Sequence, residues 1–260
     1  MTNGIVVLLG LAAGLHAALY GAYKDSPHES FLPRRFAREL VIAAIVAAGM
    51  AGLGLVDGET SFIIYLSAFA LSRITTEFWK LFVRVEPQGD YRIPTQIHCV
   101  TGVVRNPLLR LLMGAGYLAS IYGIYCAFKL LPESLPLPFR GVIVGFVIGL
   151  AEAMGGAYKD GSIEGFSWRK FAKSPSFGAL GGLIASAHTD NLAFLFLASI
   201  GSMRMFLELL FKIVPHDYAP GKFSSMTGSF VEWASLRRHF LPPYAATWML
   251  YIILCSRPGW

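Results

Sequence analysis

The chain has 260 residues, of which 55% are hydrophobic and 15% are charged, and its formal net charge is +6. Soluble domains carry about 25% charged residues, so this low share and the long apolar runs exclude an ordinary soluble domain. They indicate an integral, multi-pass membrane protein. In such a protein an excess of basic residues reflects topology, and we expect no nucleic-acid partner.

A transmembrane helix needs roughly 20 predominantly apolar residues, and fewer where the bilayer thins. Eight segments approach or reach this length, namely 4–23, 39–56, 61–83, 108–131, 138–157, 175–189, 191–213 and 241–256. We therefore predict an all-α fold, a polytopic membrane bundle of about eight transmembrane helices. The N-terminus has no basic region and no small-residue cleavage site, so the first segment is interpreted as a helix and not as a removed signal.

One stretch, which covers the end of the first predicted helix and the connection after it, occurs twice. Residues 14–37 and 149–172 align without a gap, and 13 of the 24 positions are identical. Four identical pairs are ionisable: Lys24 and Lys159, Asp25 and Asp160, Glu29 and Glu164, Arg34 and Arg169. Membrane composition repeats apolar residues by chance, but not charged residues at a fixed spacing. We therefore predict an internal duplication, with one four-helix membrane repeat in 1–134 and a second in 135–260.

The basic residues are concentrated in four connections between the predicted helices. Nineteen of the 22 Lys and Arg residues lie in 24–38, 73–110, 158–173 and 204–238. The positive-inside rule places these connections in the cytoplasm and both termini on the non-cytoplasmic side. Because each repeat has an even number of helices, both copies have the same orientation. We therefore predict parallel repeats, related by an axis along the membrane normal.

The Gly-rich segment 175–189 is short and leaves an alternative open. An inverted repeat would need an odd number of helices in each copy, and a thinned or broken helix here would mark a binding site near the middle of the membrane. Glycines also allow close packing of intact helices. The same packing role is predicted for Gly10 and Gly14 and for their counterparts Gly145 and Gly149.

A second repeated pattern places Arg and Glu four residues apart near the basic end of a predicted helix in each copy. The residues are Arg73 and Glu77 in the first copy, and Arg204 and Glu208 in the second. Residues at this spacing share a helix face, and inside a membrane each charge is costly without a partner. One interpretation is an ion pair within each helix. The other is a catalytic or binding site in which Arg binds a phosphate or carboxylate, and Glu orients it or acts as a base.

The eight repeated charged residues of the first pattern are candidate ligand-binding residues. A basic interfacial loop with aromatic residues commonly anchors a protein to anionic lipid head groups. The fixed Lys-Asp pair, with Glu four residues later, favours a folded loop with specific pairing instead. In either case we expect membrane lipids with anionic head groups as partners.

Two ionisable residues inside predicted helices break the symmetry between the copies. His16 lies in the first helix, and Glu152 lies in the fifth, one position from the equivalent of His16. An intramembrane Glu is rare and marks a candidate functional site, unless a nearby Ser, Tyr or backbone group satisfies it. If the copies face each other across the pseudo-axis, His16 and Glu152 could approach each other.

The sequence contains no pattern that predicts a metal site, a cofactor or a disulfide framework. The other histidines form no ligand-spaced cluster, and Cys99, Cys126 and Cys255 are far apart. The phosphate-loop, dinucleotide-binding, zinc-protease and nucleophile-elbow motifs do not occur.

The run from Arg73 through Glu77, Phe78 and Trp79, followed by Pro87 and Asp90, resembles the late-helix motif of prolipoprotein diacylglyceryl transferases. In that family an Arg-x3-Glu-Phe-Phe helix is followed by Pro-Asp, and the second copy, ending in residues 215–223, is similar to a divergent form of it. Those enzymes are polytopic and transfer a diacylglyceryl group from phosphatidylglycerol to a lipoprotein cysteine.

The resemblance implies lipid-head binding by Arg73 and Arg204, with Glu77 and Glu208 beside them. The His-Gly-Gly and Arg-x-Gly-Asn-Phe segments of that family do not occur in this chain. The family also acts on the outer side of the membrane, whereas the basic residues place this pattern inside. The resemblance therefore extends to a lipid site and not to the lipoprotein reaction.

Three classes of function follow from these patterns. The first is a protein that binds or acts on anionic lipid or phosphate head groups at the cytoplasmic interface, including a lipid-modifying transferase. The second is a transporter or channel with its path along the pseudo-two-fold axis, using Glu152 and His16. The third is a structural subunit held by partners in a larger membrane complex.

Overall fold

A computed structural model of the chain describes residues 1–88, 91, 93–99, 102–214 and 235–257, without the side chains of Glu29, Asp160 and Ser162. Its described residues form eight α-helices: α1 (Asn3–Glu29), α2 (Pro33–Gly52), α3 (Ser61–Phe78), α4 (Pro107–Phe128), α5 (Leu137–Glu164), α6 (Trp168–Ala185), α7 (Leu192–Glu208) and α9 (Leu241–Cys255). Each predicted apolar segment coincides with one of these helices. The prediction of an all-α fold is therefore confirmed.

The remaining regular elements are short. Two π-helical turns, η1 (Trp79–Val83) and η2 (Leu209–Ile213), continue α3 and α7, and a 3-10 turn, η4 (Arg237–Phe240), precedes α9. Strands β1 (His98–Cys99) and β2 (Gly102–Val103) pair antiparallel, with His98 opposite Val103. These elements, with η4, lie in the basic connections that follow α3 and α7.

Four stretches of helix are long and apolar enough to cross a membrane: Asn3–His28, Pro107–Phe128, Leu137–Lys159 and Leu192–Ile213. Their lengths of 22 to 26 residues match the roughly 20 residues that the hydrocarbon core requires. The chain therefore has the helices of a membrane protein.

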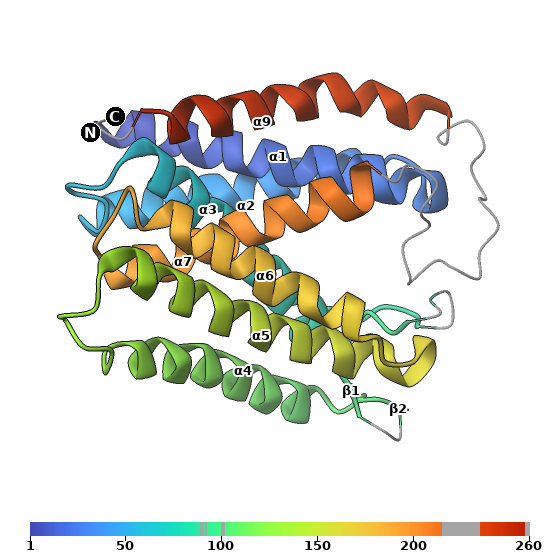
Figure 1. The fold of residues 1–260 in the computed structure, drawn as a ribbon. Helices are drawn as coiled ribbons and strands as arrows, with labels where there is room; N and C mark the ends of the chain where they lie inside the picture. Colours follow the sequence, from blue (N-terminus) through green and yellow to red (C-terminus); the bar gives the residue numbers. More distant parts are fainter. Residues whose placement is uncertain (89–90, 92, 100–101, 215–234, 258–260) are drawn as a thin grey trace.

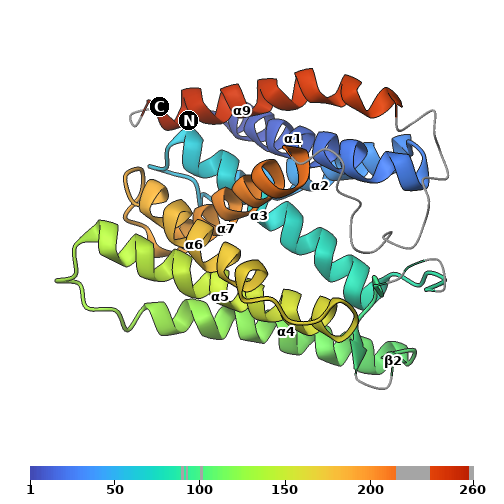
Figure 2. The same cartoon turned by 45° about the vertical axis from the view of Figure 1, so that its right-hand side comes forward.

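Helices α3 and α7 form the centre of the bundle and pack against each other. The α1–α2 hairpin packs on α3 and the α5–α6 hairpin packs on α7, so the hairpins lie on opposite sides of the central pair (Figure 1, Figure 2). Helix α9 lies over α1, and α4 lies at the opposite edge of the bundle, beside α5 (Figure 1). The start of α1 and the end of α9 are at the same end of the bundle.

The helix ends follow the same 135-residue offset as the sequence repeat. Helices α1 and α5 end 135 residues apart, and α2 and α6 begin 135 residues apart. The turn between the helices contains a residue with positive φ in each copy, 63° at Ser30 and 78° at Gly165. Glycine adopts this conformation at little cost, whereas serine does so rarely. The repeated stretch of sequence thus forms a helix–turn–helix with matching helix ends at both places.

Helices α1 and α5 extend beyond the ends predicted from the apolar runs. Both Gly-Ala-Tyr-Lys-Asp runs lie in the final turns of these helices, so the predicted loop is wrong for residues 24–29 and 159–164. Tyr23 and Ser26 are buried, so packing continues α1 past the apolar residues, whereas the equivalent Tyr158 of α5 is exposed. Lys and Glu are also good helix formers. The prediction failed because it ended each helix where hydrophobicity ended.

Close packing within each hairpin depends on glycines. A Cβ at Gly10 or Gly14 would collide with α2, and a Cβ at Gly145 or Gly149 would collide with the backbone of α6. The predicted small-residue packing face is therefore confirmed in both copies. The Gly-rich segment belongs to one continuous helix, α6, which includes Pro175. Its glycines serve helix contact and do not mark a break.

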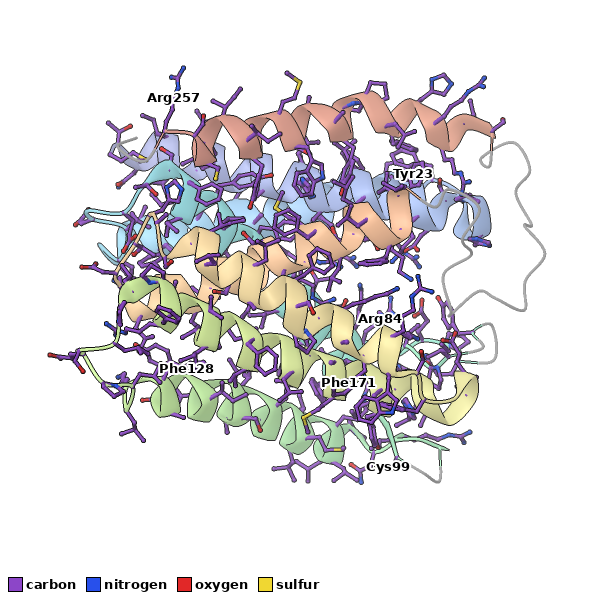
Figure 3. All side chains as sticks on the ribbon, in the orientation of Figure 1. Tyr23, Arg84, Cys99, Phe128, Phe171 and Arg257 are labelled. Carbon is purple, nitrogen blue, oxygen red and sulfur yellow. The ribbon has the colours of Figure 1, made fainter. Side chains whose placement is uncertain are left out.

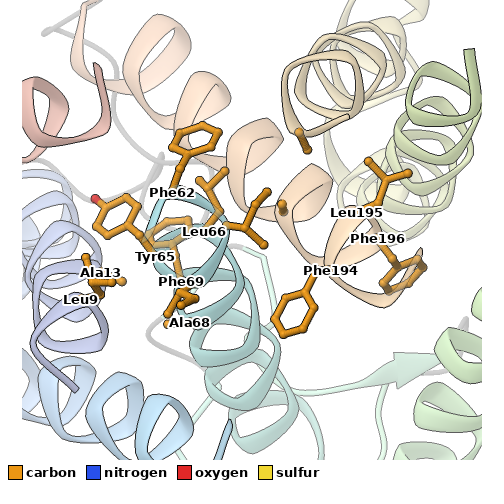
Figure 4. Packing of buried hydrophobic residues seen from close by; sticks show 14 of the residues in the cluster. Leu9, Ala13, Phe62, Tyr65, Leu66, Ala68, Phe69, Phe194, Leu195 and Phe196 are labelled. Atoms are coloured by element: carbon orange, nitrogen blue, oxygen red, sulfur yellow. The ribbon is translucent and has the colours of Figure 1, made fainter. Parts of the chain in front are cut away.

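The core fills the half of the bundle nearest the termini. Phe62, Tyr65, Leu66 and Phe69 of α3 are fully buried and pack in one cluster with Leu195 of α7 (Figure 4). All four α3 residues lie in the first half of that helix, on the side where the chain begins and ends. The described basic connections lie at the other end, where Figure 3 shows Arg84 and Cys99 opposite Arg257.

Candidate functional site

A cavity of about 950 Å³ lies at the basic end of the bundle, between α3, α4, α5 and α7. Its charged part is lined by Lys24, Arg73, Glu77, Glu152, Lys159, Arg169, Lys170, Lys173, Arg204, Glu208 and Lys212. Eight of these described residues are basic and three are acidic. A concave site with this excess of positive charge concentrates anions.

The repeated Arg–Glu pattern forms ion pairs between helices and not within them. Arg73 of α3 pairs with Glu208 of α7, with 3.5 Å between Nη2 and Oε1. Arg204 of α7 pairs with Glu152 of α5 at 2.6 Å. The interpretation as a pair within each helix is therefore wrong, because the i, i+4 spacing places both side chains on a face that meets another helix.

The Arg73–Glu208 pair connects the two central helices, α3 and α7, and remains incompletely satisfied. Both side chains are largely buried, and neither Arg73 Nε nor Glu208 Oε2 has a hydrogen-bond partner among the described residues. A buried donor or acceptor without a partner costs about 1–3 kcal/mol. Such atoms in the lining of a cavity are suited to a polar ligand group.

Glu77 has a different partner from Glu208, although the two are equivalent in the sequence. Its carboxylate accepts a hydrogen bond from Lys80 at 3.2 Å, one helical turn further on. Lys80 lies in η1, and the corresponding turn η2 begins directly after Glu208. Isolated π-helical turns are rare and frequently occur at functional sites. Here η1 and η2 change the angular positions of the side chains around α3 and α7, just beyond Glu77 and Glu208.

The deeper part of the cavity is apolar and elongated. Phe196, Ile200, Met203 and Leu207 line it along α7. Its other walls are Ile121 and Ile124 of α4 and Ile148 of α5. The thirteen residues from Phe196 to Glu208 are separated by twelve steps along the helix, which correspond to about 18 Å at 1.5 Å per residue. The cavity therefore joins a cationic end to an apolar groove that runs into the bundle.

Helix α4 forms one wall of this groove but is packed loosely. Most of its surface is exposed, and its main contacts are with η1. Its first turn is fixed by Arg110, which is buried and donates hydrogen bonds to the carbonyl oxygens of Leu81 and Arg84. Arg110 thus closes the C-terminal end of η1. Sequence reasoning assigned it only to a basic connection, because the target carbonyls are 26 and 29 residues away.

The two copies of the repeated stretch carry side chains of different size at the positions that line the groove. His16 and Tyr20 of α1 correspond to Ala151 and Gly155 of α5, and Ala151 and Gly155 line the cavity. His16 is fully buried, and its Nδ1 is 2.8 Å from Thr247 Oγ1 of α9. Its ring also contacts those of Phe69, Tyr244 and Trp248. Large side chains therefore fill the α1–α9 interface, whereas small residues leave space between α5 and α4.

His16 and Glu152 do not share a partner. His16 bonds with Thr247, and Glu152 pairs with Arg204 at the charged end of the cavity. Glu152 therefore belongs to the candidate site, and His16 belongs to the filled interface of the first copy.

A second, smaller cavity of about 200 Å³ adjoins the first. The two share Tyr20, Lys24, Arg73, Glu77 and Lys159 in their linings. The smaller cavity is completed by the α1–α2 turn, the first turns of α2 and the connection after η1. Lys24 and Lys159 of the first repeated pattern thus meet Arg73 and Glu77 of the second between two adjoining cavities.

The structure separates the predicted ligand-binding residues into two groups. Lys24 and Asp25 form an ion pair at 3.4 Å and line the small cavity, and Lys159 lines both cavities. Arg169 lines the large cavity. Arg34 and Glu164 line neither cavity, and Glu164 pairs with Lys170. The side chains of Glu29 and Asp160 lie outside the described residues.

Sequence reasoning missed two carboxylates: Glu39, which lines the small cavity, and Glu86, which holds the cavity residue Arg84. Glu39 of α2 is buried and binds Arg38 at 2.7 Å and Thr76 of α3 at 3.2 Å. Glu86 binds Arg84 at 2.6 Å. Burial and the adjacent Glu86 carboxylate, which accepts a hydrogen bond from Tyr91, raise the pKa of Tyr91. An acidic residue at the start of an apolar segment was the available signal for Glu39.

No protein-family model, characterised protein or solved structure matches the chain. Among the described residues, no group of three or more His, Cys, Asp or Glu side chains could hold a metal ion. The chemistry of the two cavities is therefore the basis for assigning a function.

Proposed function

We propose that all eight helices cross the membrane as two parallel four-helix repeats, with the basic end in the cytoplasm and both termini on the other side. The common 135-residue offset of sequence and helix ends supports the repeat. The position of the described basic connections at one end of the bundle supports the orientation.

We propose that the protein binds an anionic lipid in the large cavity, with its phosphate-bearing head group at the charged end. The observation that carries this proposal is the continuity of a cationic end with an apolar groove in one cavity. A soluble anion would need only the charged end, and an uncharged lipid tail would need only the groove. An anionic amphiphile complements both parts.

The lipid would be held by the residues that the repeated patterns provide. Arg73, Lys159 and Arg204 supply positive charge for the phosphate, and Glu77 and Glu208 lie beside them. The resemblance to diacylglyceryl transferases extends to the lipid site alone, and we propose transfer of a lipid group to another acceptor as the reaction that such a site would carry out. In that reaction Glu77 or Glu208 would orient the attacking group or accept its proton.

Transport along the pseudo-axis is the second candidate, because both copies contribute to the cavity lining. The fully buried side chains of Phe62, Tyr65 and Phe69 fill the bundle between this cavity and the end that carries the termini. A transported solute would have to displace this core. The geometry therefore supports a binding protein or enzyme better than a transporter.

Filling the groove tests this proposal. Gly155 lines the large cavity and its Cβ position is open, and the first copy has Tyr20 at the equivalent place. Gly155→Tyr should therefore fold and fill the groove. Gly123→Tyr, on the exposed side of α4 where the Cβ position is also open, is the matched control.

Native mass spectrometry of each purified protein measures the lipid that it retains. We expect anionic lipid on the wild type and on Gly123→Tyr, and its loss from Gly155→Tyr, with all three proteins monodisperse. Retention of the same lipid by a folded Gly155→Tyr protein would contradict the proposal, as would a wild type that carries no anionic lipid.

A further inference from the structure

We infer that the small cavity is a second anion site, which binds the phosphate group of a small, water-soluble molecule next to the lipid head group. This inference rests on the proposed lipid function, because it supplies the partner that the lipid would meet. The site has a volume of about 200 Å³, which is below the 300–1,000 Å³ typical of pockets for drug-sized ligands. It therefore suits a phosphate with only a few attached atoms.

Three partly buried arginine side chains give the small cavity its specificity. Arg38, Arg73 and Arg84 line it, and the Nε atom of each is buried without an acceptor among the described residues. Arginine binds phosphate through several donors held in one plane. An unsatisfied buried donor is costly, so three of them around one cavity indicate a missing acceptor group.

The ion pairs that these arginines already make leave their Nε donors without an acceptor among the described residues. The terminal nitrogens of Arg38 and Arg84 are held by Glu39 and Glu86, at 2.7 and 2.6 Å. These ion pairs fix the orientation of the two guanidinium groups while their Nε atoms remain unused. The result is a preorganised set of donors, whose ordering cost is already met before a ligand binds.

The position of the small cavity distinguishes its ligand from a lipid. Its wall is mixed: charged residues of α1, α2, α3 and the connection after η1 lie beside small and aromatic residues such as Ala17, Phe31 and Phe36, at the basic end of the bundle. The apolar groove along α7 belongs only to the large cavity. Lys24, Arg73, Glu77 and Lys159 separate the two spaces and face both. Two anions bound there would meet across the same four side chains.

Phosphate binding to purified protein tests the inference, with inorganic phosphate as the probe and isothermal titration calorimetry as the readout. Arg84→Gln removes a donor of the small cavity only, and Arg84→Lys keeps the charge without the Nε donor. Ile200→Trp narrows the groove of the large cavity only. Lipid retention by native mass spectrometry is measured on every variant.

We expect saturable phosphate binding to the wild type, weakened about tenfold or more by Arg84→Gln and less by Arg84→Lys, because a charge-assisted hydrogen bond is lost. Lipid retention should be unchanged in both variants. Ile200→Trp should lower lipid retention and leave phosphate binding within about twofold, since the two ligands use separate spaces.

Several results would overturn the inference. These are a wild type that binds no phosphate, a folded Arg84→Gln protein that binds it normally, or an Ile200→Trp protein that loses phosphate binding together with lipid. The last result would assign the phosphate to the lipid head-group position in the large cavity. If the wild type binds phosphate but carries no anionic lipid, the proposed lipid function is refuted and the phosphate site is not. A tungstate soak, read as density beside Arg38 and Arg84, locates the anion without any substitution.

Discussion

Removal of the Lys159 charge should weaken lipid binding far more than removal of another basic residue at the same end of the bundle. Lys159 lines both cavities and makes no hydrogen bond or ion pair with the described part of the chain. Its charge is therefore available to a ligand. Arg34 belongs to the same repeated pattern, but it is exposed and lines neither cavity, so it is a matched control.

The magnitude follows from the surroundings of the two residues. A hydrogen bond to a charged group in a partly buried site contributes about 1.5–3 kcal/mol, which corresponds to about a 10- to 150-fold change in affinity. A basic residue at the membrane surface contributes about 1 kcal/mol or less, which corresponds to about fivefold. Lys159→Gln should thus exceed Arg34→Gln by an order of magnitude at the upper end of these ranges.

The assay is a titration of each protein in detergent with phosphatidylglycerol, with occupancy read by native mass spectrometry. Phosphatidylcholine, which has no net charge, serves as the comparison lipid, and its weaker binding should differ little between the proteins. Equal weakening by Lys159→Gln and Arg34→Gln would refute the reasoning, because it would show that general surface charge and not the cavity binds the lipid.

Two further predictions concern stability. Gly145→Ala should destabilise the protein by about 1–3 kcal/mol, because the added Cβ would collide with the carbonyl of Gly178. The control Gly123→Ala should raise stability by up to about 1 kcal/mol, because alanine favours the helix more than glycine does. Thermal unfolding in detergent measures both changes, and equal shifts in the two variants would contradict the close packing of α5 on α6. Burial raises the pKa of Glu59, which lies between α2 and α3, so the folded protein disfavours the charged form of this side chain. The resulting loss of folding stability is present at neutral pH and disappears as the pH falls through the raised pKa. Glu59→Gln should therefore raise the melting temperature at pH 7 but not at pH 4, and a gain of the same size at both values would exclude this cause.

The positions of the helices could be predicted from the sequence because length and hydrophobicity determine them in a membrane protein. The packing glycines could be predicted because Gly10 and Gly14 recur as Gly145 and Gly149, and a repeated small residue has few other roles. The ends of α1 and α5 could not, because residues that form helices well continue both helices where their polarity suggests a loop, and burial of Tyr23 adds to this in α1 alone.

The arrangement of the site could be predicted only in part. The repeat identified Arg73, Glu77, Arg204 and Glu208 as a set, but spacing along one helix gives no information about which other helix faces it. The pairing of Arg73 with Glu208 depends on the packing of α3 against α7. The cavity itself arises from an absence of bulk at Ala151 and Gly155, which stand where the first copy has His16 and Tyr20. This difference is visible in the aligned copies, but its consequence requires the position of α4.

Photolabelling of the groove tests the central claim most directly. A phosphatidylglycerol analogue with a photoreactive group in its acyl chain is incorporated into membranes that contain the protein, and the crosslinked residues are mapped by mass spectrometry. We predict labelling of Ile121 and Ile200, which line the groove, and its loss in Gly155→Tyr. Labelling confined to exposed outer residues such as Ile45 and Ile252 would contradict the account, because the lipid would then contact only the outside of the bundle.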